Sequence, residues 1–163
     1  MIILFGPTGA GKTYVGKLLQ KDFGYYFYDG DTDLTDAMKL ALNRMKPITD
    51  TMRNRFIARL LTSIDRLSHS HSKLAVAQTF IKEKYRLTLL KRHPQAKFIL
   101  IKTKQAIRYR RRKKRADYPW SEAYVKKMDA LFEPPKISHL TLTNDNTGSI
   151  HLLASLRRLL LAL

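Results

Sequence analysis

The sequence predicts a three-layer α/β/α fold, in which a five-stranded parallel sheet lies between two layers of helices. Short apolar segments of strand length alternate along the chain with longer segments of helical periodicity. The length of 163 residues suits one domain, and no internal repeat or low-complexity linker divides it. We therefore expect a single domain over residues 1–163, whose strands run parallel because helices connect them.

The strands are expected at residues 1–5, 25–29, 74–80, 97–103 and 138–143. A helical insertion of about 33–72 separates the second strand from the third, and Pro47 interrupts it before Thr49, which can cap the next helix. A helix near 82–91 ends at His93-Pro94, and a short lid of about 105–122 follows the fourth strand. The last helix, capped by Asn146-Thr147, is expected to pack against the sheet through its apolar face.

The segment after the first strand, Gly6-Pro7-Thr8-Gly9-Ala10-Gly11-Lys12-Thr13, matches every fixed position of the phosphate-binding P-loop. An apolar strand precedes it and an amphipathic helix follows it, which is the context that the motif requires. Its backbone N–H groups and the start of the helix should converge on phosphate oxygens. We expect Lys12 to reach the β- and γ-phosphates of ATP and Thr13 to offer its hydroxyl to Mg²⁺.

The second strand, which we expect to lie beside the first, ends in a pair of carboxylates separated by one glycine, Asp29-Gly30-Asp31. Ligands of parallel sheets bind beyond the carboxyl ends of the strands, so both carboxylates should face the γ-phosphate. One can hold magnesium through a water, and the other can accept the proton of an attacking hydroxyl. We assign magnesium binding to Asp29 and proton acceptance to Asp31. The sequence alone leaves open whether these two roles are exchanged.

The chain is strongly basic, since 31 Lys and Arg against 13 Asp and Glu give a net charge of +18. Such a field attracts nucleic acid, but it also serves an enzyme that binds ATP. We therefore leave nucleic acid open as a partner and do not favour it. Seven of the eight residues from 108 to 115 are cationic. We expect Arg111 and Arg115 to close over the triphosphate and the others to include solvated charges.

The absence of cysteine excludes disulfides and thiolate metal sites, and the five histidines lack the spacing of paired metal ligands. The only metal that we expect therefore arrives with the nucleotide. Because the first strand begins at residue 1 and no apolar run approaches the length of a membrane span, we expect a cytoplasmic protein without membrane contact. It would act as a monomer or homodimer on a small-molecule acceptor.

Together these motifs resemble the small P-loop kinases of metabolites, and within them the gluconate kinases, with shikimate kinases as near relatives. The resemblance spans nearly the whole chain. It implies a P-loop fold of the nucleoside monophosphate kinase type and transfer of the γ-phosphate of ATP to a hydroxyl. The matching segments besides the P-loop are Asp29-Gly30-Asp31, Pro47-Ile48-Thr49-Asp50 with Arg53, Tyr85-Arg86, the lid arginines Arg111 and Arg115, and Leu131-Phe132-Glu133-Pro134.

The chain departs from the gluconate kinases on the acceptor side. Residues 34–35, Met38, residues 41–42 and residues 117–120 replace the polar or histidine-containing segments of that family. Arg53 and Arg86 follow segments that should border the acceptor pocket, where a guanidinium suits a carboxylate or phosphate. We therefore expect a small, anionic, hydroxylated acceptor of open identity. The alternatives are a kinase of nucleotides or nucleic-acid 5′ ends, and a nucleotide-dependent RNA-binding module without transfer activity.

Overall fold

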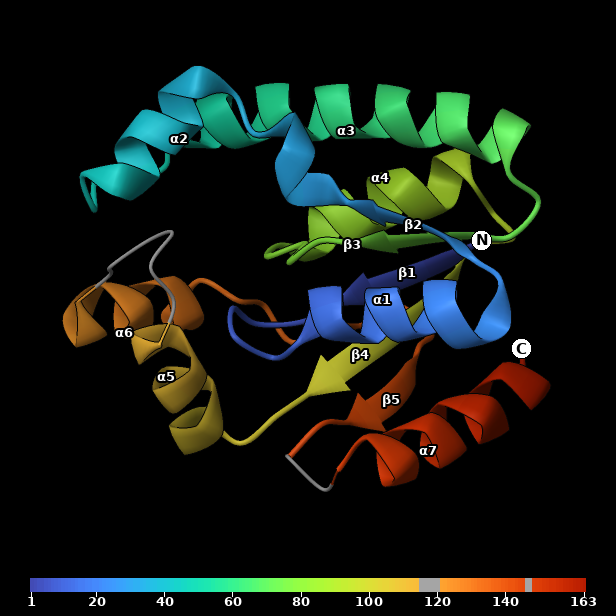
Figure 1. The fold of residues 1–163 in the computed structure, drawn as a ribbon. Coiled ribbons are helices and arrows are strands. Elements are labelled where there is room, and N and C mark those ends of the chain that lie inside the picture. Colours follow the sequence, from blue (N-terminus) through green and yellow to red (C-terminus); the bar gives the residue numbers. More distant parts are fainter. Residues whose placement is uncertain (115–120, 146–147) are drawn as a thin grey trace.

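The computed structural model describes residues 1–114, 121–145 and 148–163 and has the expected three layers (Figure 1). All five strands run parallel, in the order β2-β3-β1-β4-β5. The strands are β1 (Ile2–Phe5), β2 (Tyr26–Asp29), β3 (Leu74–Ala77), β4 (Lys97–Lys102) and β5 (Leu140–Thr143). The helices are α1 (Lys12–Phe23), α2 (Asp36–Asn43), α3 (Asp50–Ser70), α4 (Glu83–Arg92), α5 (Gln105–Lys113), α6 (Glu122–Ala130) and α7 (Ser149–Leu161), and a 3₁₀ turn, η1, spans Gly30–Asp33.

The central strand β1 is buried on both faces, as its uninterrupted apolar sequence requires. Ile3 and Phe5 belong to the core formed with α2, α3 and α4, whereas Ile2 and Leu4 belong to the core formed with α1 and α7. Figure 1 shows α2, α3 and α4 on one side of the sheet and α1 and α7 on the other. The two cores fix β1 rigidly, and the P-loop begins where β1 ends.

The strand β2 does not lie beside β1, contrary to our expectation, because β3 lies between them. The burial of the two strands agrees with this order. All four residues of β3 are buried, as befits an interior strand, whereas the Tyr-rich β2 is partly exposed at the sheet edge. The acidic pair therefore reaches the P-loop across the end of β3.

The insertion between β2 and β3 contains two helices whose limits follow the sequence signals. Pro47 lies between α2 and α3, and the Thr49 hydroxyl accepts a hydrogen bond from the Met52 N–H, which confirms the expected cap. Asp33 ties η1 to β2 and α3, because its carboxylate accepts hydrogen bonds from the hydroxyls of Tyr28 in β2 and Ser63 in α3. This insertion covers the upper side of the pocket described below.

The helices α5 and α6 lie beyond the carboxyl ends of the strands (Figure 1), and α5 falls within the segment expected to form the lid. The C-terminal α7 packs on the sheet through Leu152 and Leu156, which confirms that its apolar face serves the core. It begins at Ser149, and the expected capping residues Asn146 and Thr147 lie outside the described residues. In the described parts of the chain, no helix combines the length and apolarity needed to cross a bilayer.

Candidate active site

The P-loop curls around the side chain of Lys12, whose ammonium group donates hydrogen bonds to the carbonyl oxygens of Gly6 (2.9 Å) and Pro7 (3.0 Å). These contacts hold the cation across the mouth of the loop, where phosphate oxygens can replace the carbonyls. Gly11 precedes α1 with φ of 94°, and a Cβ there would lie 2.2 Å from the Asn144 amide nitrogen. Only glycine fits this position, because it tolerates the left-handed backbone and leaves room for the close approach.

The rear of the P-loop is tied to the ends of β4 and β5 through the carbonyl oxygen of Ala10. It accepts hydrogen bonds from the Thr103 hydroxyl (2.9 Å), the Asn144 amide (2.9 Å) and the Arg111 guanidinium (3.3 Å). Thr103 and Asn144 are buried. The loop is therefore fixed from behind, while Thr8, Gly9, Gly11, Lys12 and Thr13 line the cavity in front of it.

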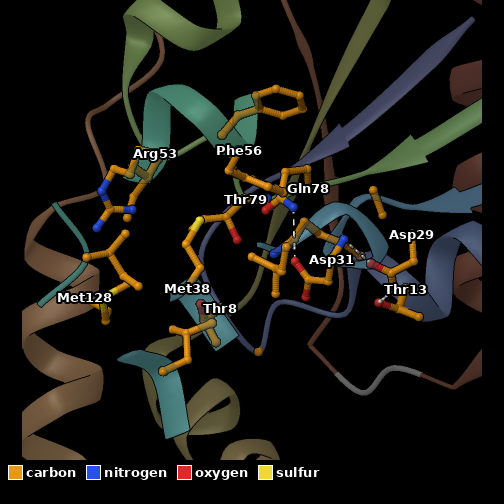
Figure 2. A pocket seen from close by; sticks show the side chains of 18 of the residues that line it. Thr8, Thr13, Asp29, Asp31, Met38, Arg53, Phe56, Gln78, Thr79 and Met128 are labelled. Carbon is orange, nitrogen blue, oxygen red and sulfur yellow. Dashed lines mark hydrogen bonds between the residues drawn. The ribbon is translucent and has the colours of Figure 1, made fainter. Parts of the chain in front are cut away.

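Asp29 lies against the first turn of α1. Its Oδ2 accepts a hydrogen bond from the Thr13 hydroxyl (2.9 Å), and its Oδ1 accepts one from the Asp31 N–H (3.1 Å) (Figure 2). The Thr13 hydroxyl and a carboxylate are hard oxygen donors of the kind that Mg²⁺ prefers. This pair of residues therefore fits a magnesium ion bound beside the P-loop.

Close packing of α1 on β2 brings Thr13 and Asp29 together. Gly16 lies one turn after Thr13, and Phe27 lies two residues before Asp29 on the same face of the strand. A Cβ on Gly16 would lie 2.0 Å from the Phe27 ring, so the helix and the strand can approach this closely only at glycine.

Asp31 is oriented by Gln78, the first residue after β3. The Gln78 amide donates a hydrogen bond to Oδ1 of Asp31 (3.0 Å), while its own oxygen accepts one from the Thr79 N–H (2.6 Å). Both Asp31 and Gln78 line the same cavity as Lys12. The two carboxylates thus have different neighbours, with Asp29 beside the Thr13 hydroxyl and Asp31 turned to the end of β3.

Arg53, on the first turn of α3, lies across the cavity from these carboxylates (Figure 2). Figure 2 shows Arg53 and Met128 on one side and Thr13, Asp29 and Asp31 on the other. The Arg53 side chain is buried, and its Nη2 atom has no hydrogen-bond partner among the described residues. Burial lowers the pKa of Arg53, as expected for a cation withdrawn from water. A buried guanidinium with an unused donor favours an anionic ligand at this end.

Arg86 does not enter the cavity, although the sequence placed it with Arg53. It is fully buried behind the wall, where its guanidinium donates hydrogen bonds to the carbonyl oxygens of Phe80 (2.9 Å) and Glu133 (2.7 Å) and pairs with Glu83 (2.5 Å). The rings of Phe5 and Phe132 flank it. Arg86 therefore holds the loop after β3 in place, including Phe80, whose φ is 43°.

The basic segment of α5 also divides into distinct roles. Arg111 donates hydrogen bonds to the Asn144 carbonyl (3.0 Å) and to the P-loop, and it lines the cavity. Arg108 pairs with both oxygens of Asp129 (2.8 Å each) and donates to the Thr8 carbonyl (3.1 Å), so it supports the loop. Arg112 is buried and also lines the cavity. Arg115 and residues 117–120 lie outside the described residues.

Several site residues were missed by the sequence analysis, namely Gln78, Thr103, Asn144 and Arg112. A signal for three of them was present, because Gln78, Thr103 and Asn144 each follow immediately after a strand. The rule that sites form beyond the carboxyl ends of parallel strands applies to them as it does to Asp29. Arg112 could not be distinguished from its cationic neighbours by spacing alone.

Comparison with known proteins agrees with this architecture. Residues 2–125 match the sequence model of a protein family described as AAA domain. A probable gluconokinase of Xenopus tropicalis is 31% identical over 90 residues, which cover 55% of this chain and 47% of that protein. A shikimate kinase of a Nostoc species is 46% identical over 44 residues, which cover 27% of this chain and 24% of the relative.

The aligned part spans about half the length of the gluconokinase and about a quarter of the shikimate kinase. The fold likeness extends further. The crystal structure of a sugar kinase from a Janibacter species superposes with a TM-score of 0.81 at 19% identity, covering 98% of this chain and 92% of that one. The expected resemblance to gluconate and shikimate kinases is thus confirmed, as is the fold class.

Proposed function

This chain belongs to the AAA domain family of P-loop proteins, and from this premise we propose that it is an ATP-dependent phosphotransferase. The acceptor is the hydroxyl group of a small anionic metabolite. One observation carries the proposal: a single cavity of about 370 Å³ joins the P-loop, the two carboxylates and the buried Arg53. That size suits a small ligand, since such pockets usually measure about 300–1,000 Å³.

ATP would bind with its β- and γ-phosphates in the P-loop, where Lys12 exchanges its two carbonyl partners for phosphate oxygens. Thr13 and Asp29 would hold Mg²⁺, which neutralises charge on the phosphates when bound. Arg111, already anchored at the edge of the loop, would add positive charge to the triphosphate. A lid role for Arg115 remains part of this proposal.

Asp31 is the proposed general base. Its carboxylate accepts the proton of the acceptor hydroxyl as that oxygen forms a bond to the γ-phosphorus. The bond from the γ-phosphorus to the β–γ bridging oxygen breaks at the same time, and its electron pair leaves with ADP. The proton then passes from Asp31 to solvent. The Gln78 hydrogen bond supports this assignment because it fixes the carboxylate in the cavity.

Arg53 would bind the anionic group of the acceptor and so place the hydroxyl toward Asp31. Its unused donor and its burial support this role. Arg86 contributes only indirectly, through the loop that forms part of the wall. The acceptor-binding part of the single domain would then be the α2–α3 insertion, with α5 and α6 on the lid side.

Release of ADP, measured with Mg²⁺ over a panel of hydroxy acids, sugar acids and phosphorylated alcohols, tests the proposal. Lys12→Ala should abolish turnover because the γ-phosphate loses its main cation. Asp31→Asn should lower kcat by at least about 100-fold while ATP affinity stays within about threefold. Full phosphoryl transfer by Asp31→Asn would contradict the assignment of Asp31 as the general base. ATP binding without acceptor-stimulated ADP release would refute the proposed kinase activity.

A further inference from the structure

The walls of the cavity between its two charged ends are mainly apolar. Met38 and Leu42 come from α2, Phe56 and Ile57 from α3, and Phe80 and Ile81 from the loop after β3. Figure 2 shows Met38 between Arg53 and Asp31, with Phe56 on the same wall as Arg53. Ligand atoms in this middle region would therefore contact hydrocarbon.

Three polar side chains, those of Gln78, Thr79 and Tyr85, also line this part of the cavity, and those of Gln78 and Tyr85 make hydrogen bonds within the protein. The Gln78 amide donates to Asp31 and accepts from the Thr79 N–H, and the Tyr85 hydroxyl donates to the side-chain oxygen of Asn54 (3.0 Å). A ligand with several hydroxyls in this region would leave water and find little to bond with, which is costly for each buried hydroxyl.

From this arrangement we infer that the acceptor is an amphiphilic hydroxy acid, with an apolar body between its anionic group and the reacting hydroxyl. The inference rests on the proposed phosphotransferase function and narrows its substrate class. Arg53 takes the anion, Asp31 faces the hydroxyl, and Met38, Leu42 and Phe56 enclose the body. Polyhydroxylated sugar acids have the carboxylate and the hydroxyl that suit Arg53 and Asp31, but their intermediate hydroxyls do not suit the apolar walls.

Two six-carbon acids provide a matched test. 6-Hydroxyhexanoate and D-gluconate share a carboxylate and a terminal hydroxyl, and they differ only in the four hydroxyls between them. An apolar pocket rejects one added hydroxyl by up to about 100-fold, so four should exceed that factor. We expect kcat/KM for ADP release with 6-hydroxyhexanoate to exceed that with gluconate by at least about 100-fold. ω-Hydroxy acids of about four to eight carbons then define the best length of the apolar body.

Binding is measured separately by calorimetry with Mg²⁺ and a non-hydrolysable ATP analogue. The same preference should appear in Kd, so that the substrate class is tested even without turnover. Preferred binding of 6-hydroxyhexanoate without any ADP release would refute the kinase and support the apolar acceptor site. Equal or better binding and turnover of gluconate would overturn the inference and leave the kinase intact. Binding of neither acid would overturn it as well.

Met38 offers the matched pair of variants. Met38→Gln places an amide in the wall at nearly constant volume and should reduce the preference for 6-hydroxyhexanoate over gluconate by about tenfold. Met38→Leu keeps the wall apolar and should retain the preference ratio, even where the absolute rate changes. Thermal unfolding of both variants checks that they are folded. An unchanged ratio in folded Met38→Gln would contradict the assigned wall.

Discussion

At the scale of single residues, Arg53 and Arg86 are both buried but differ in how many hydrogen bonds they make within the protein. Each nitrogen of the Arg86 guanidinium donates to a backbone carbonyl or to Glu83, whereas the Arg53 guanidinium lines the cavity with an unused donor. Burial alone therefore does not identify a binding residue. The number of contacts already made within the protein distinguishes a structural cation from one that awaits a ligand.

The same substitution should consequently affect the two sites differently. Arg86→Ala should lower the free energy of unfolding by about 3–5 kcal/mol, because it leaves Glu83 without its buried partner. Arg53→Ala should leave stability nearly unchanged and raise the acceptor KM by about 10–100-fold, the size of a lost charge-assisted hydrogen bond. Urea unfolding and steady-state kinetics on both variants measure this. Equal destabilisation, with the acceptor KM unchanged in Arg53→Ala, would contradict the assignment.

Glu83 should make folding stability depend on pH. Burial alone would raise the pKa of its carboxyl, but hydrogen bonds from Arg86 and from the N–H groups of Lys136 and Ile137 outweigh burial and lower the pKa. The folded pKa thus lies below the unfolded one. The stabilisation is complete above the ordinary value of 4.5 and is lost as pH falls through the folded pKa.

Urea unfolding between neutral pH and about pH 3 measures this contribution. Glu83→Gln keeps the size of the side chain and removes the charge. The variant should be less stable at neutral pH, and its stability should fall less steeply in acid. A wild-type slope that persists in Glu83→Gln would assign the acid sensitivity to other carboxylates.

At the scale of elements, the position of α1 against β2 decides the geometry of the proposed metal ligands. Gly16→Ala should push the helix away from Phe27 and cost about 1–3 kcal/mol of stability through overpacking. It should also weaken the dependence of ATP binding on Mg²⁺, since Thr13 and Asp29 separate. Calorimetry with and without Mg²⁺ measures the second effect, and thermal unfolding measures the first.

Phe27→Val removes the ring that the new methyl group would strike and serves as the reference. Adding Gly16→Ala to this background should cost less than about 0.5 kcal/mol, because the two positions are coupled only through that clash. The same loss in both backgrounds would show that the helix itself, and not its contact with β2, disfavours alanine.

Much of the element level was predictable, because strands and P-loop have strong local signals. The apolar run before Gly6 and the cap at Thr49 both appear as expected. The position of β2 at the edge of the sheet was not predictable, because strand order depends on the crossover connections, which no local sequence pattern encodes. The direction of Arg86 was also missed, although Glu83 three residues earlier on the same helix is the spacing of an ion pair.

At the scale of the whole molecule, the charge of +18 leaves the choice between a small acceptor and a polynucleotide to experiment. For a small acceptor, kcat/KM should fall by less than about tenfold between about 50 and 200 mM salt, because few charges are screened. For a nucleic-acid acceptor with about 6–10 phosphate contacts, affinity should fall by about 10³–10⁵ over the same range. Steady-state rates and oligonucleotide binding in parallel salt series distinguish these cases.

The hydrogen bonds that support the P-loop from behind set a lower limit on the length of a functional fragment of this protein. Thr103, Arg111 and Asn144 converge on one carbonyl of the loop, and Asn144 lies beyond the family match that ends at residue 125. A fragment trimmed to the matched region would keep the whole nucleotide signature yet lose part of its scaffold. Any minimal version therefore has to retain the final strand.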